Sequence, residues 1–261
     1  MASDEEARPG LAPGSRWPAG TLFAALYGDL APHPWWDPEH DPYFLFHERS
    51  QAMGWLDDLW GMNDAGQDHP LRTPDAALVA WFQVGVGPAS GDRPLPVQPF
   101  LRCAGDAVAR MGTVTVRAVQ VLLPVQAIDG ASRPAYAPAP SLLTAGWFGS
   151  GDPRSRTVVR AALDSGQSPS IPAAAPRMRE AMGRQEVFAC ESLSLADHDP
   201  LTGRPPFDDR LWNGPPAHRA TFGGVLAEWS LDAVGWLAAF LADVAAGHGI
   251  ATPLLLTVTR P

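Results

Sequence analysis

Residues 219–259 read RATFGGVLAEWSLDAVGWLAAFLADVAAGHGIATPLLLTVT and carry the strongest structural signal in the chain. The pattern predicts a strand over 219–229, followed by Ser230, whose hydroxyl is a good helix N-cap. An apolar, amphipathic helix is expected over 231–246, and glycines end it. The run PLLLTVT at 253–259 then predicts a closing strand. This unit is strand, helix, strand.

An earlier part of the chain repeats the same order of elements. Alternating apolar residues predict a strand over 78–86, and helical periodicity predicts a helix over 97–110. A β-branched strand over 113–123 follows. Its apolar phase slips near Ala118, which indicates either a β-bulge or burial on both faces.

Repeated strand-helix-strand units favour an α+β fold, a sandwich of the ferredoxin-like type. Residues 1–18 are rich in proline, glycine and charge and predict a flexible tail. Residues 19–261 then form a single α+β domain, with a structural duplication expected over about 19–128 and 141–261. An α/β fold with a mixed or doubly wound sheet is the alternative, disfavoured because few helices are available to cover both faces.

The remaining elements are read from shorter patterns. Helices are expected over 21–30, 49–60 and 154–163, and strands over 141–148 and 186–195.

Composition excludes several classes of chemistry. All 19 basic residues are arginine, so Schiff-base catalysis, pyridoxal phosphate attachment and a P-loop nucleotide site are excluded. The only two cysteines, Cys103 and Cys190, are far apart and too few for an iron–sulfur cluster. The net charge of −9 opposes the phosphate backbone, which makes nucleic acid an unlikely partner.

No segment predicts a membrane protein or a secreted one. The N-terminus is acidic and lacks the basic and apolar regions of a signal peptide. The most apolar run, 231–244, is too short to cross a bilayer. A cytoplasmic protein without membrane contact is the expectation.

A candidate metal site lies in residues 33–48, which are dense in histidine and carboxylate. We take His33, Asp37 and His40 as its ligands, because imidazole and carboxylate are common ligands of divalent metals. The spacing matches no metal motif of known geometry. The alternative is an acidic loop that packs its aromatic residues over the core: Trp35, Trp36, Tyr43 and Phe44.

A candidate catalytic site follows the strand expected over 186–195. Asp197, His198 and Asp199 come at the end of that strand, where functional loops often lie, and their side chains suit general acid/base chemistry. The alternative is a turn-rich surface loop whose charges are solvated.

Two hypotheses for function follow. The first is an acidic protein, without an evident catalytic motif, that binds a protein partner or a small molecule; a basic partner would suit its charge. The second is a small accessory-metabolism enzyme that uses His, Asp and Glu side chains for general acid/base or metal chemistry. The first is favoured by the ten tryptophans and the negative charge.

Overall fold

The computed structural model describes residues 19–37, 39–67, 77–89, 93–129, 141, 145–183, 185–195, 214 and 217–260. Its first half contains six main elements: β1 (Gly20–Pro32), α1 (Pro42–Ala52), β2 (Trp60–Gly66), β3 (Leu78–Val86), α2 (Val97–Met111) and β4 (Gly112–Leu123). The second half contains six in the same order: β5 (Thr157–Asp164), α4 (Ser170–Met182), β6 (Phe188–Ser194), β7 (Arg219–Leu226), α5 (Leu231–Gly247) and β8 (Leu254–Thr259). The described residues between the halves include the single-turn helices η1 (Val125–Ala127), α3 (Gly146–Gly149) and η4 (Pro153–Ser155).

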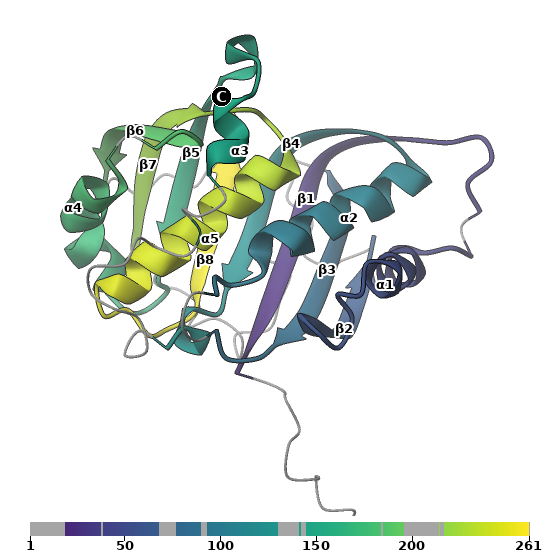
Figure 1. The fold of residues 1–261 in the computed structure, drawn as a ribbon, viewed down its shortest axis with the longest axis horizontal. Coiled ribbons are helices and arrows are strands. Elements are labelled where there is room, and N and C mark those ends of the chain that lie inside the picture. The colour runs from purple at the N-terminus through teal and green to yellow at the C-terminus, as the bar shows by residue number, and fades with distance from the viewer. Residues whose placement is uncertain are drawn as a thin grey trace, which may run out of the picture.

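The strands form one sheet of eight in the order β2-β3-β1-β4-β8-β5-β7-β6. Every neighbouring pair is antiparallel, including β4 and β8, which join the two halves at the centre. Figure 1 shows α1, α2, α5 and α4 on the same face of this sheet. The fold is therefore α+β, and the parallel, doubly wound alternative is wrong.

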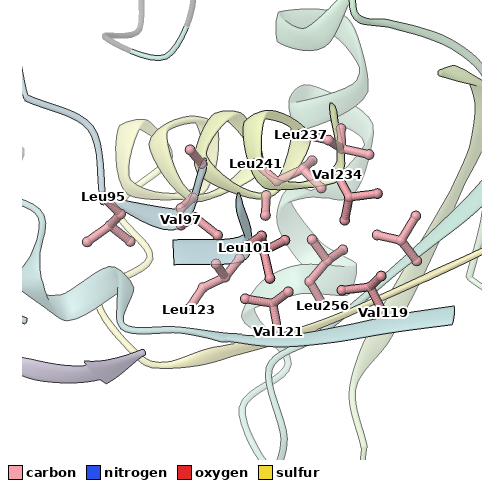
Figure 2. Close-up of a cluster of buried hydrophobic side chains, with 14 of the residues drawn as sticks. Leu95, Val97, Leu101, Val119, Val121, Leu123, Val234, Leu237, Leu241 and Leu256 are labelled. Carbon is pink, nitrogen blue, oxygen red and sulfur yellow. The ribbon is translucent and has the colours of Figure 1, made fainter. Parts of the chain in front are cut away.

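The main core lies between the sheet and its layer of helices. Val119 and Val121 of β4 and Leu256 of β8 face the apolar side of α5 across this core, as Figure 2 shows. The amphipathic pattern expected for α5 understates its burial, since residues 233–245 are buried on all sides. Asp243 is buried with them and accepts hydrogen bonds from the backbone nitrogen and hydroxyl of Ser141, at 3.2 and 2.8 Å.

Residues 21–30 belong to strand β1, so the helix expected there is wrong. This strand lies inside the sheet and is buried on both faces: Leu22, Ala24 and Leu26 face the helices, and Phe23 and Ala25 belong to a second cluster on the opposite face. A continuous apolar run of this length has no polar face to reveal a period of two, so periodicity does not distinguish it from a buried helix.

The elements expected over 141–163 are also wrong. Residues 154–163 contribute to η4 and β5 instead of a helix, and Val159, Ala161 and Leu163 alternate into the core as strand residues do. The strand expected over 141–148 is replaced by the start of α3, with residues 142–144 outside the described part. The helix expected over 49–60 ends at Ala52, because Gly54 and Asp57 take left-handed backbone angles, with φ of 67° and 65°.

The phase slip predicted near Ala118 is confirmed, and both of its alternative explanations, a bulge and burial on both faces, occur. The pairing of β1 with β4 shifts between Tyr27 and Gly28, which leaves Arg117 as the extra residue of a bulge beside Ala118. From Ala118 onward β4 is also buried on both faces.

In the described part of the chain, no helix is long and apolar enough to cross a membrane.

Candidate functional site

Helix α1 and the loop before it form the most unusual surface of the described chain. Asp41 is the N-cap, and its Oδ1 accepts from the backbone nitrogen of Phe44 at 2.8 Å. Pro42 follows at the first helical position, where its missing N–H costs nothing. This local chemistry explains why the helix begins here, in a segment that prolines would otherwise break.

One face of α1 is anchored in the core by Phe46. Its ring is fully buried and lies 5.0 Å from the ring of Phe82, 5.6 Å from that of Phe100 and 6.0 Å from that of Trp60. Such aromatic contacts add to the free energy gained by burying the rings. The helix is thereby held rigidly against β2, β3 and α2.

Polar contacts also join α1 to α2. Arg49 donates to Asp106, with its Nη2 2.6 Å from Oδ2. The buried Ser50 hydroxyl accepts from Trp60 Nε1 at 3.3 Å and lies 3.5 Å from the sulfur of Cys103. Burial raises the pKa of the Cys103 thiol to about 12, so this cysteine is an inert packing residue.

Large apolar side chains are exposed on α1, in the loop before it and at its C-cap. Trp35 is 67% exposed, Phe44 44%, Met53 41% and Tyr43 38%. They are four of the seven large hydrophobic residues that are exposed in the described chain, and we call them the α1 surface. Apolar side chains on both faces of a surface helix are unexpected for a helix that only packs against its own core.

Histidine rings order this surface. His33 stacks on Trp35 with ring centroids 4.6 Å apart, and His40 stacks on Phe44 at 5.0 Å. These contacts restrict the exposed rings before any partner binds. A preordered aromatic side chain loses less conformational entropy on binding than a freely rotating one.

The same segment holds most of the protein's excess negative charge. Residues 33–64 contain seven carboxylates and one arginine, a net −6 of the whole chain's −9. All seven carboxylates are exposed: Asp37, Glu39, Asp41, Glu48, Asp57, Asp58 and Asp64. The single arginine, Arg49, is already paired with Asp106. The exposed aromatic rings therefore lie in a segment with a large excess of exposed carboxylates.

The three residues expected to bind a metal lie in this loop but serve other contacts. His33 Nε2 lies 3.2 Å from the carbonyl oxygen of Ala109, and Asp37 Oδ1 accepts from the backbone nitrogen of Glu39 at 3.0 Å. His40 is engaged in its stack on Phe44. Among the described residues, no three His, Cys, Asp or Glu side chains are grouped so as to hold a metal ion. The structure does not bring the predicted ligands together.

The expected catalytic residues Asp197, His198 and Asp199 lie outside the described residues. The strand before them is present as β6, close to the predicted bounds. The catalytic assignment stays a prediction.

Comparison of the chain with protein-family models, curated protein sequences and solved structures returned no significant match.

Sequence reasoning identified this segment but assigned its aromatic residues incorrectly. The packing alternative placed Trp35, Tyr43 and Phe44 over the core, whereas all three are exposed and only Trp36 packs against the core in part. The missed signal is the cap at Asp41. Once the helix starts there, Pro42, Phe46 and Ser50 follow at intervals of four and define the inner face, which leaves Tyr43 and Phe44 outside.

Proposed function

We propose that this protein is a binding module whose α1 surface docks onto a positively charged protein. The observation that carries the proposal is the coincidence of exposed, ordered aromatic rings with a net −6 over residues 33–64. The proposal rests on this surface and requires no catalytic residue.

The two features have separate roles in binding. Tryptophan and tyrosine are enriched at the energetic centres of interfaces, because they bury a large area and lose few rotamers. The surrounding carboxylates attract a basic partner during diffusion and repel acidic proteins. The rings would supply affinity, and the charges would supply association rate and choice of partner.

The second half of the chain offers an internal comparison. Helix α4 has the same place in the element order as α1, yet its exposed residues include Ala173, Arg177, Arg179 and Glu180 and no aromatic. Packing against a sheet therefore does not by itself require exposed rings on such a helix. This contrast supports a binding role for α1.

Comparison of the two halves also supports a finer description of the fold. Each half runs β-α-β-β-α-β, and the strand orders β2-β3-β1-β4 and β6-β7-β5-β8 correspond position by position. Both edge strands shift register at the same place, between Met62 and Asp64 in β2 and between Cys190 and Ser192 in β6. We propose that the chain is a tandem of two ferredoxin-like units, of which the first carries the docking surface.

The proposal is tested by affinity capture with matched variants. Tyr43→Ser/Phe44→Ser alters only exposed side chains of α1, and Arg177→Ser/Glu180→Ser is the control on α4. We expect wild type and the control to retain one basic protein in stoichiometric amount, and the α1 variant to bind it at least about tenfold more weakly. The wild-type affinity should fall with added salt. Capture that is unaffected by the α1 substitutions would refute the proposal.

The enzyme hypothesis remains a separate candidate that depends on Asp197, His198 and Asp199. It predicts loss of an activity on His198→Ala, whereas the docking proposal predicts no effect of this change on partner binding.

A further inference from the structure

The two halves of the chain meet at a step in the sheet. β8 pairs only with residues 118–123 of β4, so residues 112–117 of β4 continue beyond it and are paired on one side, with β1. Trp229, in the short connection from β7 to α5, lies beside this free edge. Its Nε1 donates to the carbonyl oxygen of Val116 at 2.9 Å.

A cavity of about 270 Å³ opens at this step. Val116 and Val119 of β4 form one wall, Leu231 and Val234 of α5 form another, and Trp229 also lines the cavity. The walls thus come from both halves of the chain, and junctions between structural units are common places for small-molecule sites. The volume of the cavity lies just below the usual range for small-molecule sites, so its ligand would be smaller than a typical drug-sized molecule.

Arg260 supplies the charge at the cavity. It follows β8 directly, and its guanidinium carbon lies 5.8 Å from the centroid of the Trp229 ring, within cation–π distance. Within the part of the chain that the structure describes, Arg260 has no ion pair with a carboxylate. A guanidinium that is positioned by an aromatic ring and lines a cavity with both polar and apolar walls is suited to bind a carboxylate in bidentate geometry.

Ser230, at the beginning of α5, also lines the cavity. Its hydroxyl already makes hydrogen bonds within the protein. It donates to Glu228 Oε1 at 2.6 Å and accepts from the backbone nitrogen of Ala233 at 3.1 Å. The neighbouring carboxylate of Asp232 faces Arg102, with Oδ2 4.0 Å from Nη1. Neither acidic side chain lines the cavity, and among the described residues that line it Arg260 alone is charged.

We propose that this cavity binds a small organic carboxylate with an aromatic or branched aliphatic body. The carboxylate would pair with Arg260, and the apolar body would displace water from the valine, leucine and tryptophan walls. This site is separate from the α1 surface and does not depend on the docking function.

Isothermal titration with defined probes tests the inference. Benzoate and 3-methylbutanoate supply the two kinds of apolar body, and benzamide supplies the uncharged control for the carboxylate. We expect saturable binding of at least one carboxylate, with benzamide weaker by about tenfold, because a charge-assisted hydrogen bond contributes roughly 1.5–3 kcal/mol.

Two arginine substitutions locate the site. Arg260→Gln should weaken binding of the carboxylate by about tenfold or more, whereas Arg117→Gln should leave it unchanged. Arg117 is a matched control because it is exposed, lies on β4 and is paired with Asp29 outside the cavity. The inference is overturned if neither carboxylate binds, if benzamide binds equally well, or if the two variants behave alike.

Discussion

Two arginine–aspartate pairs have the same geometry but differ in burial, which predicts very different contributions to stability. Arg219 donates through Nε and Nη2 to Asp164 Oδ2 at 3.0 and 2.8 Å, and the two side chains are 14% and 4% exposed. Arg117 donates through the same nitrogens to Asp29 Oδ2 at 3.1 and 2.6 Å, with exposures of 64% and 62%. The change to compare is Asp164→Ala against Asp29→Ala.

The expected magnitudes follow from solvation. Asp164→Ala removes the carboxylate that the buried Arg219 guanidinium binds and also removes the acceptor for the Gly166 backbone nitrogen, 2.8 Å from Oδ1. A loss of about 3–5 kcal/mol in the free energy of unfolding is expected. Asp29→Ala leaves a guanidinium that water can solvate, and its cost is about 0–1 kcal/mol. Replacing the buried pair together, as Asp164→Leu/Arg219→Met, should restore most of the lost stability.

Urea denaturation followed by tryptophan fluorescence measures all three variants against wild type. If Asp164→Ala is too unstable to fold, Asp164→Asn against Asp29→Asn makes the same comparison, because the amide keeps an acceptor for Gly166. Equal losses for the buried and exposed pairs would refute the reasoning that burial decides the contribution.

Three further predictions concern single residues. Burial raises the pKa of Asp232, so the folded state binds the proton of this carboxyl more tightly than the unfolded chain does. The folded state therefore loses stability as the pH rises. Asp232→Asn should raise the urea midpoint at pH 7 but not below about pH 4. A lower midpoint at pH 7 would contradict this. In the native protein, Cys103 should resist alkylation at pH 8 while the half-buried Cys190 reacts first, and mass spectrometry would measure the two rates. Equal rates would refute the assignment of Cys103 as an inert packing residue. Gly235→Ala should lower the melting temperature although alanine favours helix by about 1 kcal/mol, because a β-carbon there would lie 2.8 Å from Gln98 Cα; a higher melting temperature would exclude this clash.

The predictions that succeeded concern elements whose surroundings are visible in their own sequence. Strand β3 and helix α2 form within a residue of their predicted bounds, since the spacing of large apolar residues along each shows its period. The phase slip at Ala118 marked a real bulge, because an extra residue inverts the alternation of a strand wherever it occurs.

The predictions that failed concern elements with neighbours on every side. β1 contacts β3 and β4 within the sheet and apolar residues on both faces, so its sequence carries no polar stripe. For the candidate site, composition marked residues 33–48 as unusual and left two interpretations open, a metal site and an acidic loop that packs its aromatic residues over the core. The N-cap at Asp41 sets which side of α1 faces the core, and Tyr43 and Phe44 are exposed as a result.

The sequence by itself determined the α+β class and the segment in which negative charge and aromatic rings accumulate. These properties depend on residue identity and local spacing, which the chain carries before it folds. Only the tertiary structure decided which rings are exposed, that β4 and β8 join two similar halves, and that Arg260 lines a cavity beside Trp229. The pairing of β4 with β8 and the contact of Trp229 with Val116 join residues more than a hundred positions apart, which no local pattern records.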